Sequence, residues 1–296
     1  MNIQDLEYYH ELVRVKNFSK VATNFNVSQP TITNAVKRLE SELHTSLFFR
    51  DQSHHAVTVT SSGQQFDQHV AIILSELEIA HKEMKNNQQQ KIRFGLPPII
   101  GNYFFPPLTP LLMRHQLMTR LEVIEHGSTA LLEMIRHGDL DIALLGSIIP
   151  LNYPRLTSTT ISRAPIRIIV GREHPLAAKA HSGVYFTELA KEKFITFDEG
   201  FVHNQAFRSM TKINHLRPHI IYKTADVHVI KSLVAENIGI SYLTGLAILP
   251  SNNLVQVPLL DRKQPEFLVS AVRRNTAIMT DPKQDLWELL TNYLPK

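Results

Sequence analysis

The segment from Phe18 to Arg50 constrains the fold of this chain most, because it contains two short helical patterns joined by a tight turn. Ser19 is a good N-cap for the first helix, which continues through Ala22 and Phe25. Asn26 follows, and asparagine tolerates the left-handed backbone conformation that a tight turn needs. The pattern therefore predicts a helix-turn-helix.

The second helix of this pair has one apolar face and one polar face. Ser28 is its expected N-cap, and Pro30 stands in the first turn, where the missing backbone donor costs nothing. The expected buried face consists of apolar residues at helical spacing: Ile32, Val36, Leu39 and Leu43. The other face carries hydroxyl, amide and basic side chains that suit base edges and phosphates: Ser28, Gln29, Pro30, Thr31, Thr33, Asn34 and Lys37. A merely solvated amphipathic helix is the alternative, but the paired caps and the short turn favour DNA reading.

Several segments resemble LysR-type transcriptional regulators. The amino-terminal domain of that family is similar to VSQPTITNAVKRLESEL (27–43), LFFR (47–50) and VTVTSSG (57–63). Its effector domain is similar to HGDLDIALLG (137–146), REHPLA (172–177) and VAENIGISYL (234–243). The resemblance covers essentially the full 296 residues, and its specificity lies in the combination of segments.

The resemblance implies an α/β protein with an all-α-rich winged helix-turn-helix N-terminal domain and a two-lobed, periplasmic-binding-protein-like (type 2) effector domain. It also implies a homotetramer assembled from dimers that binds a double-stranded DNA operator. The further partners that it implies are a small-molecule effector and RNA polymerase. Gln29, Pro30, Thr33 and Asn34 would then read bases. Phosphates would be held mainly by Lys37, Arg38 and Arg50, with a structural role as the alternative for Arg50. Effector binding would tilt the lobes and change the DNA bend, which requires unequal affinity for the two arrangements.

A small wing is expected after the second helix. Val57 and Val59 alternate with polar residues, as in an edge strand. The stretch from Asp51 to Thr58 is about two residues longer than the usual pattern of the LysR-type family. His54 and His55 stand where a basic wing-tip residue is common in that family. Histidines held protonated near phosphates would contact the DNA backbone. An ordinary exposed pair of histidines is the alternative.

The next segment predicts a long dimerising helix over residues 60–90, after a DNA-binding domain over 1–59. Thr60 is its expected cap, and KNNQQQK (85–91) is its expected hinge. Its apolar stripe comprises Phe66, Val70, Ile73, Leu74, Leu77, Ala80 and Met84. A long helix with no neighbouring globular partner buries such a stripe by pairing with a second copy. The alternative is packing on its own winged helix, expected at one end only.

Short apolar strands alternate with helices over residues 91–296, which predicts an effector and oligomerisation domain with mostly parallel sheets. The strand series restarts near Ile166. The expected lobes are 91–163 with 268–296, and 164–267, with crossovers near Arg163–Ile166 and Pro265–Leu268. The expected strands are IRFGL, RLEVIEH, LDIALLG, IRIIVG, KFITF, HIIYKT, GISYL, NLVQVPL and FLVSAVR.

Ligands of open α/β sheets bind beyond the carboxyl ends of strands, where helices begin. This rule selects as effector-binding residues Pro98, Ile99, Gly127, Ser128, Ser147, Asp198, Gly200, Phe201, His203 and Asp226. Taken singly, Ser128 and Asp226 are equally explained as helix caps. Free amides at helix starts favour a small carboxylate. Asp198 and Glu199 add negative charge that His203 or an arginine would offset, and the prolines with Phe201 predict a partly apolar site.

Composition narrows the function further. Residues 1–60 contain six basic and six acidic residues, so the net charge of +4 lies outside the DNA-reading segment. Non-specific DNA affinity of one copy should therefore be modest, and pairing of copies should matter. The absence of cysteine excludes disulfides, thiolate metal sites and a cysteine nucleophile. We expect no export signal and no membrane span, and hence a cytoplasmic location.

Enzyme and transport functions fit the motifs poorly. The chain has no GxSxG, GxxxxGK[ST], HExxH or GxGxxG motif. His215 and His219 are four residues apart, as are pairs of metal ligands on a helix, but Pro218 between them disfavours a helix there. We therefore expect no metal site, and we expect no other cofactor. A solute-binding receptor would lack the DNA-reading helix. A constitutive DNA-binding protein, whose second domain only oligomerises, stays open as an alternative.

Overall fold

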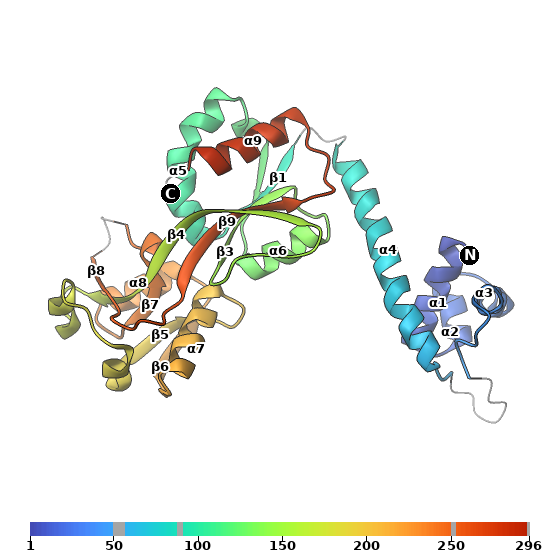
Figure 1. Ribbon diagram of the computed structural model, residues 1–296, viewed down its shortest axis with the longest axis horizontal. Helices are drawn as coiled ribbons and strands as arrows, with labels where there is room; N and C mark the ends of the chain where they lie inside the picture. Colours follow the sequence, from blue (N-terminus) through green and yellow to red (C-terminus); the bar gives the residue numbers. More distant parts are fainter. Residues whose placement is uncertain (50–56, 88–90, 250–252, 295–296) are drawn as a thin grey trace. The chain divides into compact units, whose positions relative to one another are not determined.

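The computed structural model describes residues 1–49, 57–87, 91–249 and 253–294 (Figure 1). By their internal contacts they form two compact units, Met1–Met84 and Lys85–Lys296. The helices of the first unit are α1 (Ile3–Val15), α2 (Phe18–Asn24), α3 (Gln29–Leu43) and most of α4 (Ser61–Asn87). Within the described residues, every helix is too short or too polar to cross a lipid bilayer.

Local capping explains where α2 and α3 begin. Asn17 caps α2, and its side chain accepts a hydrogen bond from the Lys20 amide at 2.9 Å. The expectation that Ser19 is the N-cap is therefore wrong, because Asn17 caps equally well and comes two residues earlier. Asn26 has φ 53°, and the Ser28 hydroxyl accepts from the Thr31 amide at 3.3 Å. The predicted turn and second cap are confirmed.

The core of the first unit lies where α1, α2 and α3 meet. Ile32 and Leu39 are fully buried, Val36 is buried, and Leu43 is half-buried, which confirms the predicted apolar face of α3. The Tyr9 hydroxyl donates to the Gly63 carbonyl at 2.6 Å and so joins α1 to α4.

Gly63 permits a close approach between the start of α4 and the segment before it. A Cβ atom at position 63 would lie 2.3 Å from the Leu47 carbonyl oxygen, so only glycine fits. The Thr60 hydroxyl accepts from the Gly63 amide at 2.9 Å, which confirms Thr60 as the cap of α4.

Among the described residues, an antiparallel bridge joins Phe48 to Val59, one on each side of the stretch where the wing was expected. The Phe49 amide donates to the Thr58 carbonyl at 2.9 Å. Arg50, His54 and His55 lie outside the described residues. The wing and the DNA contacts of these three residues therefore stay predictions.

The apolar stripe of α4 packs on the first unit near its N-terminal end. Val70 is fully buried, and Phe66 and Leu74 are half-buried against the core of this unit. Ile73 and Met84 are instead 43 % and 52 % exposed. The stripe thus contacts its own unit at one end and leaves apolar surface uncovered further along.

The second unit alternates strands with helices as expected. All nine predicted strands are present, although β4 begins well before the expected Ile166. In chain order the elements are β1 (Ile92–Gly95), α5 (Pro98–Arg114), η1 (Met118–Arg120), β2 (Leu121–Ile124), α6 (Ser128–Arg136), β3 (Ile142–Ser147), β4 (Leu156–Gly171), η2 (Pro175–Lys179), η3 (Phe186–Lys191), β5 (Lys193–Phe197), α7 (Val202–Ile213), β6 (His219–Thr224), α8 (Val227–Ala235), β7 (Ser241–Thr244), η4 (Gly245–Ala247), β8 (Leu254–Val257), β9 (Glu266–Arg274) and α9 (Asp281–Asn292).

The strands form a sheet in the order β2-β1-β3-β9-β4-β7, with β8 also paired to β4, and a separate pair β5-β6. β1 pairs with β2 and β3 in parallel, and β5 pairs with β6 in parallel. All pairs that involve β4 or β9 are antiparallel. The expectation of mostly parallel sheets is therefore wrong, because the two strands that link the lobes run in opposite directions beside each other.

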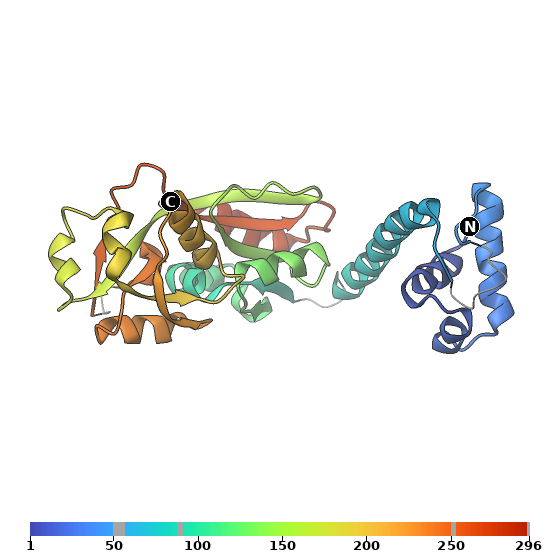
Figure 2. The ribbon, with the colours of Figure 1, turned by 90° about the horizontal axis from the view of Figure 1, so that it is seen from below.

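β4 and β9 join the two lobes of the second unit (Figures 1 and 2). Their register pairs Arg163 with Leu268 and Ala164 with Phe267, at the predicted crossovers. One lobe contains β1, β2 and β3 with α5, α6 and α9, and the other contains β5, β6, β7 and β8 with α7 and α8.

Alternation along β3 shows how the first of these lobes is layered. Ile142 and Leu144 pack into the core shared with α5 and α9. Ala143 and Leu145 point to the opposite face and pack under α6. Both faces of the sheet are thus covered by helices, and the helix starts lie at the strand ends.

Candidate functional site

The polar face of α3 is open to solvent. Gln29, Pro30, Asn34 and Lys37 are exposed, as a DNA-reading surface requires. The Gln29 side-chain amide donates to the Thr33 hydroxyl at 3.0 Å. This bond holds two of the predicted base-reading side chains together on the first turns of the helix.

Two hydroxyl groups of the same surface are engaged in the cap of α3. The Ser28 and Thr31 hydroxyl oxygens lie 2.8 Å apart and share a hydrogen bond. Ser28 is exposed and Thr31 is half-buried.

Arg38 differs from Lys37 although the two are adjacent. The Arg38 guanidinium donates to both carboxylate oxygens of Asp5, which is only 2 % exposed. These hydrogen bonds raise the pKa of Arg38 further above its ordinary value. Arg38 therefore holds α3 against α1, whereas no ion pair of Lys37 appears among the described residues.

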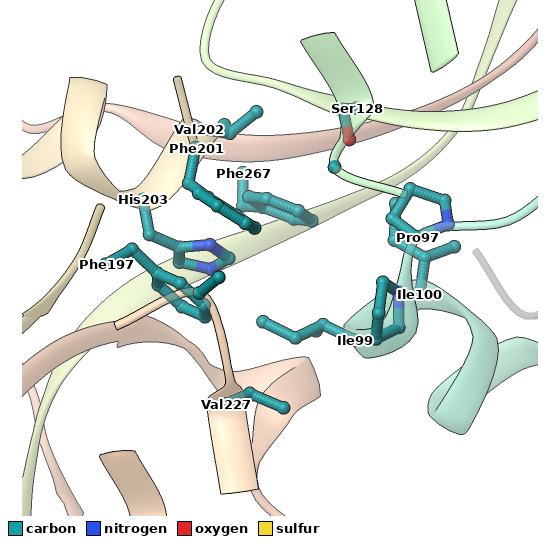
Figure 3. Close-up of a pocket in the computed structure, with 13 residues that line it drawn as sticks. Pro97, Ile99, Ile100, Ser128, Phe197, Phe201, Val202, His203, Val227 and Phe267 are labelled. Carbon is teal, nitrogen blue, oxygen red and sulfur yellow. The ribbon is translucent and has the colours of Figure 1, made fainter. Parts of the chain in front are cut away.

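Helix starts from both lobes of the second unit surround one cavity, which we call the cleft cavity (Figure 3). The N-caps of α5, α6 and α7 are Pro97, Gly127 and Phe201, and none of them makes a side-chain capping bond. Amides at uncapped helix starts attract negative charge and acceptor atoms. The residues that line the cavity are Pro97, Pro98, Ile99, Ile100, Gly127, Ser128, Phe197, Phe201, Val202, His203, Ala225, Val227 and Phe267.

Stacked rings form one wall of the cleft cavity. The His203 ring stacks on Phe267 with centroids 4.9 Å apart, and Phe197 stacks on Phe201 at the same separation (Figure 3). Burial lowers the pKa of His203 to about 3, so its imidazole is neutral at pH 7. His203 thus does not offset the charge of Asp198 and Glu199. The arginine alternative is met at Glu199, whose Oε1 atom lies 4.0 Å from Nη1 of Arg208.

The cleft cavity is small and carries no cationic side chain. Its volume is about 40 Å³, which is room for a few water molecules at most. None of its lining residues is Lys or Arg. A hydrogen bond from the Thr129 hydroxyl to the Gly200 carbonyl, 2.7 Å long, connects the two lobes beside it. A ligand with several carbon atoms can enter only if the lobes or the aromatic side chains move.

Both the N-terminal and the C-terminal region of the chain match models of known protein families. Residues 3–64 match the family model of the bacterial regulatory helix-turn-helix protein, lysR family, and residues 85–295 match the LysR substrate binding domain. The chain belongs to the LysR family of bacterial transcription regulators. It is a DNA-binding regulator with an effector-binding domain and not an enzyme.

Relatives and solved structures of the LysR family cover the chain closely. The malolactic fermentation system transcriptional activator of Lactococcus lactis subsp. lactis (strain IL1403) is 31% identical over 98% of this chain and 98% of its own. Full-length CbnR complexed with its target DNA covers 98% of this chain and 99% of that chain, with a TM-score of 0.52 and 16% identity. The effector binding domain of QuiR in complex with shikimate covers 69% of this chain and 96% of that chain, with a TM-score of 0.59 and 16% identity.

The structure of this LysR-family chain brings part of the predicted effector set together. Pro98, Ile99, Gly127, Ser128, Phe201 and His203 line the cleft cavity, and Ser147, Asp198, Gly200 and Asp226 do not. The Asp226 side chain caps α8 by accepting from the His228 amide at 2.7 Å. The N-cap of α6 is Gly127 and not Ser128, which is the first residue of the helix. The Ser128 hydroxyl oxygen accepts from the Gly146 amide at 2.8 Å and so joins α6 to β3.

The predicted effector set of this LysR-family chain omits seven apolar residues that line the cleft cavity, among them Phe197, Val227 and Phe267. Phe267 lies in β9 at a predicted crossover, so its position between the lobes was the only available signal. Phe197 ends β5, and Val227 begins α8. The rule applies to residues that follow a strand, whereas Phe197 is the last residue of β5 and Phe267 lies inside β9.

Proposed function

We propose that this regulator reads a double-stranded DNA operator with α3 and responds to a small organic acid bound in the cleft cavity. Gln29, Pro30, Thr33 and Asn34 are the base-reading residues, and Lys37 contacts phosphate. The protein acts in the cytoplasm as a homotetramer assembled from dimers, with RNA polymerase as a further partner. The comparisons support the DNA-binding and effector-binding parts of this proposal at the level of the family.

The observation that carries the ligand class is the meeting of uncapped helix starts with an apolar wall. The amides at the starts of α5, α6 and α7 provide hydrogen-bond donors for a carboxylate without a cationic side chain. The rings of Phe197, Phe201 and Phe267 provide contact for a short carbon skeleton. A small acid satisfies both surfaces at once.

Names of similar proteins support the choice of acids to test. One relative is an activator of a malolactic fermentation system, and one solved effector domain holds shikimate. Malate, lactate and shikimate are therefore the first three candidates.

Ligand entry would couple the cavity to DNA geometry. Since the cavity volume is about 40 Å³, an acid of this size must displace the lobes or the aromatic wall. The interlobe hydrogen bond between Thr129 and Gly200 would lengthen or break in that movement. An acid that binds the open arrangement more tightly shifts the population toward it.

Pairing of copies is proposed to occur along α4. Ile73 and Met84 expose apolar surface that the first unit does not cover. A second α4 would bury it and bring a second DNA-reading helix to the operator. Two paired DNA-reading helices compensate for the modest DNA affinity expected of one copy, whose residues 1–60 carry no net charge.

Thermal unfolding of the full-length protein tests the ligand class. At a hundredfold excess over Kd, a ligand stabilises the native state by about 2.7 kcal/mol. For a domain of this size the melting temperature should rise by roughly 5–10 °C. The methyl ester of the same acid should give little rise, because it lacks the carboxylate that the helix starts hold.

A charge placed in the cavity supplies a matched control. Phe201→Glu should abolish the stabilisation by the acid, since it puts a carboxylate beside the helix starts. Met113→Glu, at an exposed position of α5, should leave it unchanged. If none of the acids stabilises the protein, the alternative of a constitutive regulator with an oligomerising second domain is favoured. If acid and ester stabilise equally, the ligand class is wrong.

A further inference from the structure

The first turns of α4 are attached to α1 and to the segment before α4. The Tyr9 hydroxyl donates to the Gly63 carbonyl, and burial raises the pKa of this hydroxyl, so it stays protonated at pH 7. The rings of Tyr9 and Phe66 have their centroids 5.2 Å apart. The Thr60 hydroxyl donates to the Ser46 carbonyl at 2.8 Å. These contacts hold the start of α4 against the core of the first unit.

A polar pair of side chains lies one turn further along α4. The His10 ring nitrogen Nδ1 is 2.8 Å from the Asp67 carboxylate oxygen Oδ1, and the two side chains are 40 % and 20 % exposed. A carboxylate only accepts hydrogen bonds, so the imidazole Nδ1–H is the donor. His10 belongs to α1 and Asp67 to α4, so this bond joins the two helices directly.

Two attachment points along one helix fix its direction as well as its position. Gly63 and Asp67 are one turn apart on the same side of α4, separated by about 6 Å along its axis. Tyr9 and His10, which bind them, are adjacent in α1. The Tyr9 contact alone would allow α4 to tilt about Gly63, whereas the His10 contact one turn later opposes that tilt.

Packing beyond Asp67 leaves the direction of α4 less well defined. Val70 is fully buried and Leu74 is half-buried against the core of the unit, but apolar contacts are not directional. Ile73 and Met84 are 43 % and 52 % exposed, so the first unit does not hold the helix there. Directional contacts are supplied near the start of the helix, where the His10 bond lies.

The direction of α4 matters because the helix acts as a lever. From Asp67 to Met84 it rises by about 25 Å, at about 1.5 Å per residue. A tilt of about 10° at Asp67 would displace the Met84 end by roughly 4 Å, which exceeds the rise of about 3.4 Å per base along one DNA strand. When two copies pair along α4 while each α3 reads a half-site, such a displacement changes the separation of half-sites that fits by about one base pair.

We propose that His10 and Asp67 are positioning residues that set the half-site spacing accepted by this regulator. This role rests on the proposed function, since it requires operator reading by α3 and pairing along α4. The two side chains act through the direction of α4 and need no contact with DNA. They therefore select the spacing, while the exposed face of α3 selects the sequence of each half-site.

Binding-site selection from random-sequence DNA duplexes by the full-length protein reports half-site sequence and spacing together. The unchanged protein should select paired half-sites at one preferred spacing. His10→Ala and Asp67→Ala should select the same half-site sequence, with the spacing shifted or spread by about one base pair or more. The matched control is His69→Ala, at an exposed histidine of α4, which should select the spacing of the unchanged protein.

Rescue by a conservative variant separates this role from a general contribution to stability. In His10→Asn the amide nitrogen is as many bonds from the backbone as Nδ1 is, so it can donate to Asp67 and should restore the preferred spacing. The double variant His10→Ala/Asp67→Ala should shift the spacing no further than either single variant. Urea unfolding should give closely similar midpoints for all these proteins, because the pair is partly exposed.

Three results would contradict this role. If His10→Ala and Asp67→Ala both keep the spacing of the unchanged protein, the pair does not set it, although operator reading and pairing stand. If the half-site sequence changes instead of the spacing, the pair acts on α3 and not on the direction of α4. If the unchanged protein selects single half-sites, the pairing of copies in the proposed function is wrong, and the role of His10 and Asp67 falls with it.

Discussion

The Asp5 carboxylate of α1 accepts two hydrogen bonds from the Arg38 guanidinium of α3, with Nε–Oδ2 and Nη2–Oδ1 distances of 2.9 Å and 2.5 Å. Asp5 is almost completely buried, while Arg38 keeps part of its side chain in solvent. Removal of the arginine would leave a buried carboxylate without its counter-ion. The pair therefore sets the orientation of the DNA-reading helix on the rest of the unit.

Arg38→Gln should lower the stability of the first unit, because Asp5 loses its counter-ion. The double variant Asp5→Asn/Arg38→Gln should lose less than the sum of the single variants, since neither charge is then left unpaired. Chemical denaturation, monitored by circular dichroism, measures the free energy of unfolding of the single and double variants. Arg14→Gln, which removes an exposed guanidinium paired with the half-buried Glu11, is the control and should change stability less than Arg38→Gln. Additive losses would show that Asp5 and Arg38 do not couple.

Lys37→Gln should act on DNA affinity and leave stability unchanged. Each phosphate contact contributes about 0.9 to the slope of log affinity against log salt concentration. The slope should therefore fall by about 1 for each Lys37 that contacts phosphate, equally for specific and random DNA. Fluorescence anisotropy over a salt series measures it, and an unaltered slope would remove Lys37 from the phosphate contacts.

Gln29→Ala and Asn34→Ala should each reduce discrimination between operator and random DNA by about 1–3 kcal/mol, because amide side chains read base edges. The salt slope should stay the same, since no charge is removed. Competition binding with operator and scrambled duplexes measures the ratio. Ser41→Ala, exposed near the end of α3, is the matched control. A residue whose replacement leaves discrimination intact does not read a base.

Ile73→Glu should break the proposed α4 pairing without unfolding the first unit, because Ile73 is 43 % exposed in one copy. Each buried isoleucine contributes about 1.5 kcal/mol, and a dimer buries two. The dissociation constant of the dimer should therefore rise by a factor of order 100. Sedimentation velocity measures the change. Gln65→Glu adds the same charge at another exposed position of α4 and should leave the dimer intact. An Ile73→Glu protein that stays fully associated would show that α4 does not pair through this residue. Leu74 is unsuitable for this test, since it is half-buried and packs against the core of its own unit.

His203 should make the second unit sensitive to acid. Its folded-state pKa of about 3 lies below the ordinary value of 6.5, so only the unfolded chain takes up this proton between those values. Its contribution to stability is therefore complete above about pH 6.5 and falls by about 1.4 kcal/mol per pH unit as the pH drops toward 3.

His203→Phe keeps a ring in the stack and should flatten the pH dependence of unfolding between pH 6 and 4. Urea unfolding at several pH values measures the slope. His181→Gln, at an exposed histidine, should leave the slope unaltered. If His203→Phe unfolds with the pH dependence of the unchanged protein, the histidine is not neutral in the fold.

Features that depend on neighbouring residues could be predicted from the amino-acid sequence. The turn at Asn26, the cap at Ser28 and the buried face of α3 follow from local backbone preference and helical spacing. The nine strands were recognisable because short apolar runs repeat between helical patterns. Even local reasoning failed where two capping residues competed, as with Asn17 and Ser19 before α2.

Features that depend on contacts between distant residues became visible only in the folded chain. The antiparallel pairing of β4 with β9, the ion pair of Arg38 with Asp5, and the burial that neutralises His203 each join segments far apart in the chain. No spacing rule reports such contacts, because they arise only when the chain closes on itself. The same closure placed Phe197 and Phe267 around the cleft cavity.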